Sequence, residues 1–168
     1  VELESMAVVD GFHYKPKIDY NVLREHSEGV ICLSACIAGG VPKRLLAGDY
    51  DGAREMALNL KEIFGEDFYL EIQDHGIEEE RRVLPLLVKL ANEIGVELVA
   101  TNDVHYLKKE DAEMQDVLLC IQTKKTLDDP KRLKFSSQEF YFKTADEMKA
   151  LFPNLPQAIK NTKVIADK

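Results

Sequence analysis

The middle of the chain alternates three short apolar segments with longer amphipathic ones. The apolar segments cover residues 29–34, 68–73 and 96–101, and they are rich in the β-branched and aromatic residues that favour strands. The two segments between them, 49–67 and 76–95, repeat apolar residues at spacings of three and four, as amphipathic helices do. Such strands, joined by helical crossovers, predict an α/β fold with a parallel sheet and helices outside it.

The remaining segments give a coarser picture. Residues 68–73 alternate in polarity more than the other two apolar segments, so we expect that strand to be the less fully buried one. Beyond about residue 123 the regular alternation stops. Residues 139–143 carry a strand pattern, and two short helices follow, the first opened by a capping box formed by Thr144 and Glu147.

Composition narrows the class of protein. The chain has 168 residues, the size of one domain, and its 45% hydrophobic and 31% charged residues are typical of a globular protein. No run approaches the roughly 20 apolar residues of a membrane span, so we expect no membrane partner. The acidic N-terminal stretch lacks the basic region of a signal peptide, which predicts a cytoplasmic location. Three cysteines are too few for a disulfide framework and predict reduced thiols.

The charge balance bears on nucleic-acid binding. A formal net charge of -8 opposes tight binding to phosphates by this chain alone. Lysine and arginine are nevertheless concentrated in two stretches, residues 14–17 with Lys15 and Lys17, and residues 123–134. They are read either as solvated loop charge or as supporting nucleic-acid contacts beside a larger basic surface.

Side chains able to bind metal follow each of the three expected strands. Cys36 comes after the first, Asp74 and His75 after the second, and Asp103 and His105 after the third. The carboxyl ends of parallel strands gather on one face of a sheet or barrel, where active sites are built. Each residue taken singly has an ordinary structural explanation: a small core thiol, a turn, a helix cap or a hydrogen-bonded loop histidine.

The Asp103-x-His105 spacing is the strongest part of this pattern. Residues two apart in an extended segment point to the same side, so a carboxylate oxygen and an imidazole nitrogen reach one ion or two neighbouring ones. With the Cys36 thiolate, this mixture of ligands suits zinc, manganese or iron better than calcium or magnesium. Glu71 alternates within its strand and points either into the site or at solvent. A nucleophilic Cys–His pair is the weaker alternative, because it leaves the Asp-x-His spacing unexplained.

Long stretches of the chain also match a known family. From about Gly11 to the end, the sequence resembles the PHP (polymerase and histidinol phosphatase) domain, in the form found in the alpha subunits of bacterial replicative DNA polymerase III. The matching stretches are "GFHYKPKID", "EGVICLSACIAGGVP", "GDYDGAREMA", "FYLEIQDHGI", "LVATNDVHYLKKEDAEMQDVLLCIQTKKTLDDP" and "FSSQEFYFKTADEM".

This resemblance implies a fold and a ligand set. PHP domains are distorted (β/α)7 barrels that hold up to three metal ions at the carboxyl face of the strands. The family's cysteine ligand corresponds to Cys36, and its late Asp-x-His pair corresponds to Asp103 and His105. The family's early ligands, including an H-x-H pair, have no counterpart here. We therefore expect a partial barrel over residues 1–123 and, over residues 124–168, a connecting segment toward the polymerase core.

The resemblance also implies a function. We expect part of a replicative DNA polymerase whose PHP site, in some relatives, is a metal-dependent 3′–5′ proofreading exonuclease that activates water against a phosphodiester. The alternatives are a structural module with a non-catalytic metal and a stand-alone phosphoesterase for small phosphates. The expected partners are DNA through the parent polymerase, the rest of the alpha subunit and other replication subunits. The segment itself should not polymerise DNA and should bind its divalent metal weakly or not at all. Its open sheet edge predicts self-association or a partly disordered N-terminus.

Overall fold

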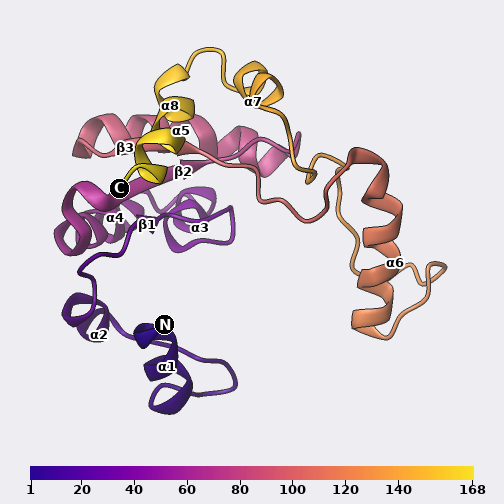
Figure 1. Cartoon of the computed structure of the whole chain (residues 1–168), viewed down its shortest axis with the longest axis horizontal. Helices are drawn as coiled ribbons and strands as arrows, with labels where there is room; N and C mark the ends of the chain where they lie inside the picture. The colour runs from indigo at the N-terminus through magenta and orange to yellow at the C-terminus, as the bar shows by residue number, and fades with distance from the viewer.

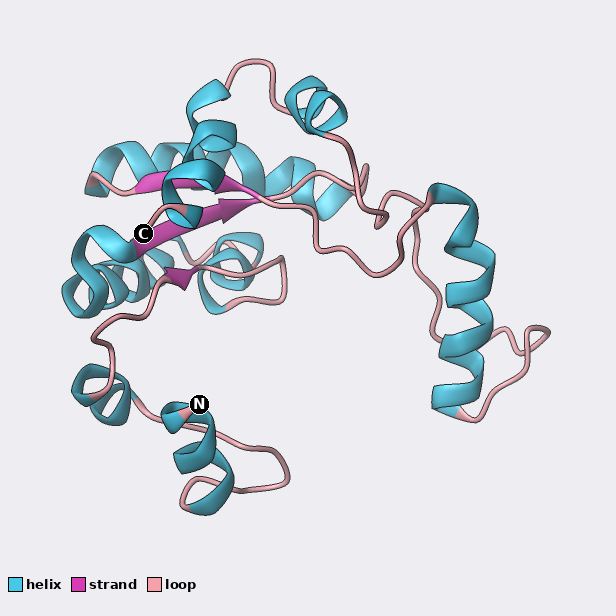
Figure 2. Cartoon of the chain, in the orientation of Figure 1, coloured by secondary structure: helices cyan, strands magenta, loops and turns pink.

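A computed structural model describes the whole chain, residues 1–168 (Figures 1 and 2). Helices form most of the regular structure and three strands form one small sheet. The elements are α1 (Glu2–Val9), α2 (Tyr20–Glu25), β1 (Cys32–Leu33), α3 (Gly40–Leu46), α4 (Tyr50–Phe64), η1 (Gly65–Asp67), β2 (Phe68–Ile72), α5 (Glu78–Ile94), β3 (Glu97–Ala100), η2 (Lys109–Asp111), α6 (Ala112–Thr123), α7 (Ala145–Leu151) and α8 (Pro156–Ala166).

The sheet is parallel, with strand order β1-β2-β3. Cys32 of β1 pairs with Phe68 of β2, and Ile72 of β2 pairs with Ala100 of β3. The expected α/β class with a parallel sheet is confirmed, and the architecture is compatible with a partial PHP β/α fold. The first strand is shorter than its apolar segment, because only two of those residues enter the ladder.

Burial within the sheet differs from the expectation drawn from polarity. Four of the five residues of β2 are buried, whereas β1 is only half-buried. The expectation that 68–73 would be the less buried strand is wrong. Its position between the other two strands decides its burial, because a central parallel strand is covered by helices and loops on both faces.

Helices α4 and α5 supply most of the core beside the sheet. In α4 the small residues Ala53 and Ala57 are fully buried, which lets this helix approach its neighbours closely. In α5 the buried residues Val83, Leu87 and Leu90 recur at spacings of four and three along one face. Both helices end at a glycine with positive φ, which is the residue type that this backbone conformation favours.

The C-terminal helix belongs to the same core. Asn161 of α8 is buried and its side-chain amide donates to the Leu98 carbonyl of β3 at 2.8 Å. Phe152 and Ala158 join the hydrophobic cluster that contains the residues of β2 and α5. In Figure 1, α8 crosses in front of the strands and α5 lies behind them. Residues 124–168 therefore contribute to the packing of the sheet.

The strand expected over residues 139–143 is absent. The only pairing in this region is an isolated bridge between Tyr106 and Tyr141. An alternating pattern needs a neighbouring strand with free backbone groups, and here the neighbour is an irregular loop. The two short helices that follow are confirmed, as is the Thr144–Glu147 capping box at the start of α7.

Helix α6 stands away from the sheet on two connecting loops (Figure 2). Leu119 and Cys120 on one side are buried, and an ion pair between Arg132 and Asp116 ties the returning loop to the helix. The other side exposes a row of large apolar side chains, namely Met114, Leu118 and Ile121, which are 64%, 56% and 69% exposed. None of the helices combines the length and hydropathy needed to cross a bilayer.

Replacing Leu90 tests the core. Leu90 is fully buried in α5, so Leu90→Ala should lower the free energy of unfolding by about 2–5 kcal/mol through lost transfer energy and a cavity. Leu133→Ala is the control, because Leu133 is 61% exposed and its removal should change that energy by at most about 0.5 kcal/mol. Chemical denaturation of both variants measures the difference, and equal effects would contradict the described core.

Candidate metal centre

A hydrogen-bond network closes the carboxyl end of the sheet. The Glu71 amide donates to Ser34 Oγ at 2.8 Å, which links the ends of β1 and β2. The Gln73 side-chain amide donates to Thr101 Oγ1 at 2.9 Å and to Glu71 Oε1 at 3.1 Å, and the Thr101 hydroxyl also donates to Glu71 Oε1. The Glu71 carboxylate therefore faces the loops after the strands. Hydrogen bonds from Thr101 and Gln73 hold this carboxylate at the end of the sheet.

Cys36 lies in a pocket beside this network. The pocket is lined by polar groups of Cys36, Glu71, Gln73 and Glu80 and closed by apolar residues of α3 and α5. Gln73 Oε1 is buried and accepts no hydrogen bond. Cys36 is half-buried and forms no disulfide. Burial raises the pKa of Cys32 to about 11, and that thiol stays protonated in the sheet.

Asp103 and His105 lie in the loop that leaves β3. The backbone of Asp103 has a φ of 42°, in the left-handed region, so the expected extended geometry of this segment is wrong. The two side chains are nevertheless neighbours, with 3.9 Å between Asp103 Oδ1 and His105 Nδ1. Aspartate is among the few residue types that adopt this conformation readily. The turn therefore brings the carboxylate and the imidazole together by another route.

One hydrogen bond selects the tautomer of His105. Its Nδ1 donates to the Asp103 carbonyl at 2.7 Å, which leaves the lone pair of Nε2 free. A backbone carbonyl on one ring nitrogen is the usual partner of a histidine that binds metal through the other nitrogen. The Asp103 carboxylate accepts no hydrogen bond, and 40% of the Asp103 side chain and 34% of the His105 side chain are exposed. Nε2 of His105 is therefore free for a ligand, while the Asp103 carboxylate lies nearest the other ring nitrogen, Nδ1.

The pair does not gather further ligands from this chain. No three His, Cys, Asp or Glu side chains are close enough together to hold a metal ion. Cys36 lies after β1 in the pocket with Glu71, and it forms no group with Asp103 and His105. The structure thus places all three residues at the carboxyl end of the sheet, and it brings only the last two together.

His75 is buried at this edge, turned away from solvent. Its Nδ1 lies 2.6 Å from Glu80 Oε1 and its Nε2 lies 2.7 Å from the Asn102 carbonyl oxygen. Since both ring nitrogens face acceptors, this geometry favours the doubly protonated ring. Burial by itself lowers the pKa of His75, but the hydrogen bonds with Glu80 and Asn102 outweigh it and raise this pKa above its ordinary value. His75 has no lone pair left for a metal.

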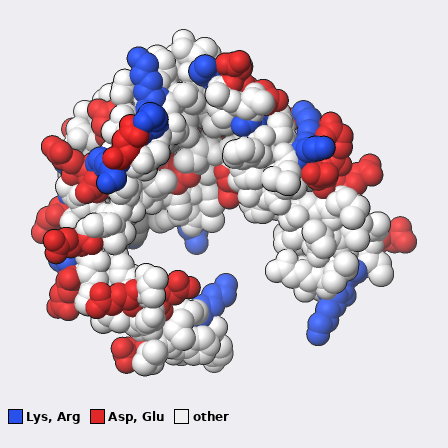
Figure 3. Space-filling view, in the orientation of Figure 1, with Lys and Arg blue, Asp and Glu red and all other residues white.

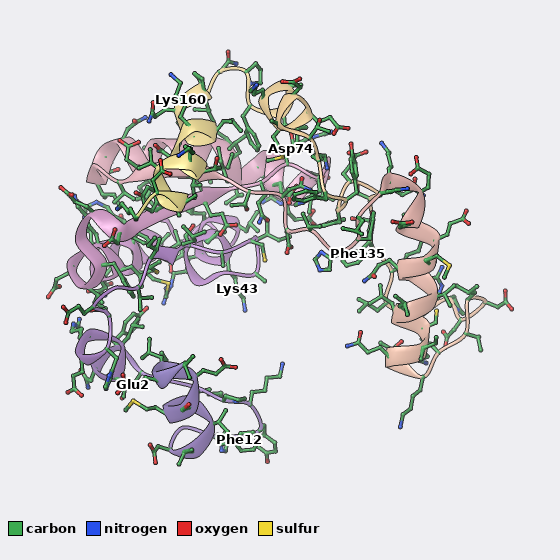
Figure 4. All side chains as sticks on the ribbon, in the orientation of Figure 1. Glu2, Phe12, Lys43, Asp74, Phe135 and Lys160 are labelled. Carbon is green, nitrogen blue, oxygen red and sulfur yellow. The ribbon has the colours of Figure 1, made fainter.

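Asp74 forms a turn beside it. Its Oδ1 accepts from the Gly76 amide at 2.9 Å, which is the turn geometry considered from the sequence. In Figure 4, Asp74 and Phe135 lie toward the same end of the sheet, from which the α6 arm extends. Asp74 thus lies at this end of the sheet, and its side chain is hydrogen-bonded to the backbone of its own turn.

Aromatic residues from a distant segment complete this edge. The Phe140 ring stacks on His75 with 4.1 Å between ring centroids, and it meets the His105 ring edge-on. The His105 amide donates to the Phe140 carbonyl at 2.8 Å. Sequence reasoning missed Phe140, Glu80 and Asn102. Only Glu80 carried a signal, as an acidic residue in the first turn of α5, five positions after a histidine.

Lys15 and Lys17 lie in the loop between α1 and α2. Both are exposed, and neither forms an ion pair. On the face in Figure 3, acidic side chains are widespread and basic ones form small separate groups. The two lysines are therefore free to contact a phosphate, although they are not part of a broad basic surface on that face.

Comparisons with known proteins show which proteins this chain is similar to. The model of the PHP domain family matches residues 1–75, which include Cys36, Glu71 and His75. The DNA polymerase III subunit alpha of Treponema pallidum is 48% identical over 167 residues, 99% of this chain and 14% of the relative. The same subunit of Borreliella burgdorferi is 46% identical over 168 residues, 100% of this chain and 15% of the relative. The chain is homologous to a segment of the bacterial DNA polymerase III alpha subunit.

This homology confirms the resemblance seen in the sequence. The DNA polymerase III subunit alpha of Thermus aquaticus is 46% identical over 153 residues, 91% of this chain and 12% of the relative. The chain spans about a seventh of the length of the Treponema pallidum and Borreliella burgdorferi subunits. Asp103 and His105 lie outside the part matched by the PHP model and inside the part matched by the alpha subunits.

The buried His75 predicts how stability depends on pH. A histidine with a raised pKa stabilises the fold fully below its unfolded pKa, near 6.5, and loses this effect as pH rises through its folded pKa. The charged groups that face it are Glu80, which favours the proton, and Lys143, which opposes it. The difference in unfolding free energy between the natural chain and His75→Gln should therefore be largest below about pH 6.5 and fall as the pH rises above it.

Denaturation at a series of pH values measures this difference. His13→Gln is the control for exchanging a histidine for a glutamine, because His13 is exposed in a loop. A flat profile for His75→Gln would show that folding leaves the pKa of His75 unchanged, and a difference that rises with pH would show that burial lowers this pKa.

Proposed function

We propose that this chain is a segment of a replicative DNA polymerase III alpha subunit and carries part of a PHP metal site for 3′–5′ proofreading. The observation that carries the proposal is the Asp103–His105 pair, with Nε2 of His105 left free by the hydrogen bond of Nδ1 to the Asp103 carbonyl. A free imidazole nitrogen and a carboxylate that accepts no hydrogen bond, on neighbouring side chains, have the chemistry of a metal-binding pair. The substrate would be the 3′ end of a DNA strand.

The ligand set we assign is Cys36, Asp103 and His105. Its thiolate, carboxylate and imidazole suit zinc, manganese or iron. A metal held there supplies a water nucleophile at neutral pH and neutralises charge on the leaving oxygen. A closed site needs at least four ligands, so further ligands would come from other parts of a longer alpha subunit. The segment alone would bind the ion weakly or not at all.

Residues of this chain would then have distinct tasks. His105 would bind the ion through Nε2, and the Asp103 carboxylate would balance its charge. The Glu71 carboxylate, held by Thr101 and Gln73, would form the rim of the site, with Asp74 and the buried His75 behind it. These side chains would orient the site while the ion supplies the Lewis acidity.

A structural module is the second candidate function. The observation that favours it is the lack of any group of three metal-binding side chains in the chain. In that case the segment would support the polymerase core, and any ion would serve only stability. A stand-alone phosphoesterase is less well supported, because identity to alpha subunits extends well beyond residue 75 and covers 99% of the chain.

The wider context follows from the same proposal. Residues 1–123 would form the later part of a PHP barrel, and residues 124–168 would lead toward the polymerase core. The partners would be DNA, the rest of the alpha subunit and other subunits of the replication holoenzyme, in the cytoplasm. The isolated segment would associate with itself through its open sheet edge.

Removing the ligand pair tests the metal site. In a full-length alpha subunit that contains this segment, Asp103→Asn combined with His105→Ala should abolish binding of the ion and lower 3′–5′ exonuclease activity at least about 100-fold. Metal content by mass spectrometry and hydrolysis of a mismatched primer measure the two effects. His26→Ala is the control, because His26 ends α2 and forms only an ion pair with Glu2.

The outcomes separate the two candidate functions. Loss of both metal and nuclease activity in the double variant, but not in His26→Ala, supports the proofreading site. Loss of metal from a protein with no nuclease activity supports the structural module. A natural alpha subunit that holds no ion at Asp103 and His105 would contradict the metal site altogether.

Replacing Lys15 and Lys17 tests the DNA contact. If both contact phosphates, Lys15→Ala with Lys17→Ala should weaken binding of duplex DNA and reduce the slope of log affinity against log salt by about 2. Lys160→Ala with Lys163→Ala is the control, because these lysines lie on α8 and carry the same total charge. Equal slopes in the two double variants would show that only net charge matters.

A further inference from the structure

His75 joins three segments that are distant in sequence. Its own loop follows β2, Glu80 belongs to the first turn of α5, and Asn102 belongs to the loop after β3. The Glu80 carboxylate accepts two hydrogen bonds from His75. Its Oε1 accepts from the ring, and its Oε2 accepts from the backbone amide at 2.5 Å. Glu80 is only 3% exposed and His75 is fully buried. These two hydrogen bonds therefore fix the position of the ring independently of its contact with the third segment.

The contact with the third segment is directly beside the proposed ligands. Nε2 of His75 donates to the carbonyl of Asn102, the residue that precedes Asp103. The Asn102 side chain donates to the Tyr141 carbonyl, so this residue is held from both sides. The peptide that enters the left-handed turn at Asp103 is thus anchored to the His75 ring.

A second path runs from His75 to the ligand pair through Phe140. The Phe140 ring stacks on the His75 ring, and its carbonyl accepts from the His105 amide at 2.8 Å. His75 thereby contacts the neighbours of both proposed ligands, while its own ring nitrogens are both used. It has the geometry of a group that holds ligands in place and binds no ion itself.

We propose that His75 is a positioning residue for the metal-binding pair Asp103 and His105, acting through the hydrogen bond of its Nε2 to the Asn102 carbonyl. This inference rests on the proposed metal site. Groups that orient metal ligands through hydrogen bonds typically change metal affinity by 10–100-fold when they are removed. The loop after β2 would thus set the geometry of the loop after β3.

Two amide substitutions separate the two hydrogen bonds of the ring. Asparagine carries its amide nitrogen near the position of Nδ1, so His75→Asn keeps a donor for Glu80 and loses the one for Asn102. Glutamine carries its amide nitrogen near the position of Nε2, so His75→Gln keeps the donor for Asn102 and loses the one for Glu80. Both variants lose the charge and the aromatic stack on Phe140, so these losses cancel in the comparison.

The pair also separates positioning from stability. His75→Gln leaves the buried Glu80 carboxylate without its ring partner, which destabilises the fold more than His75→Asn does. If His75 were only structural, His75→Asn would be the better variant in every measurement. If it positions the ligands, the less stable His75→Gln binds metal better.

The experiment uses a full-length alpha subunit that contains this segment. Zn²⁺ affinity is measured by competition with a chelator for the natural protein, His75→Asn and His75→Gln, and binding that persists in Asp103→Asn/His105→Ala is subtracted. Amide hydrogen exchange over residues 102–107 is measured in the same samples. We expect about 10–100-fold weaker Zn²⁺ binding and faster exchange for His75→Asn, with His75→Gln close to the natural protein.

Each outcome decides the question. Equal Zn²⁺ affinities of the two variants, or a lower affinity for His75→Gln, overturn the positioning role while leaving the metal site intact. No Zn²⁺ binding that depends on Asp103 and His105 in the natural protein overturns the proposed function and the ligand role of this pair. In that case, equal exchange over residues 102–107 in the two variants would also exclude His75 as the group that orders the turn.

Discussion

The pairing of β2 with a strand on each side is the constraint on which the rest of the structure depends. It aligns the carboxyl ends of three strands, and the Thr101 amide continues the ladder by donating to the Ile72 carbonyl at 3.1 Å. Because β2 and β3 end level with one another, Glu71 and Gln73 meet Thr101, and the loops beyond them lie side by side. The contacts among Glu71, Gln73 and Thr101 follow from that register.

Local patterns predicted much of the fold, because helix periodicity and apolar strands are properties of short segments. The burial of β2 was not predictable, since it depends on the strand's place in the sheet, which no single segment contains. Residues 139–143 also show that a local pattern does not contain the information about remote partners. Their alternation suits a strand, yet the backbone opposite them at Tyr106 is irregular and offers only one bridge. Strand formation depends on a partner, and the partner is remote in sequence.

The candidate site was predictable in its residue types and less so in its geometry. The spacing of Asp103 and His105 pointed to a ligand pair, although the left-handed backbone that joins them has no local signature. The sequence also did not reveal which histidine has a ring nitrogen without a hydrogen-bond partner. His75 and His105 both follow strands, but one ring has two acceptors and the other has one. That difference is made by Glu80, whose position opposite His75 depends on how α5 packs.

The exposed apolar row on α6 has a consequence for how the segment behaves as a solute. Met114, Leu118 and Ile121 lie on one side of a helix that projects from the rest of the chain. The net charge of -8 keeps copies apart at low ionic strength, but this repulsion extends only about 10 Å at 0.1 M salt. Added salt removes the repulsion and leaves the apolar attraction in place. The colloidal stability of the isolated segment is therefore set by ionic strength, and its most concentrated solutions are those of low salt.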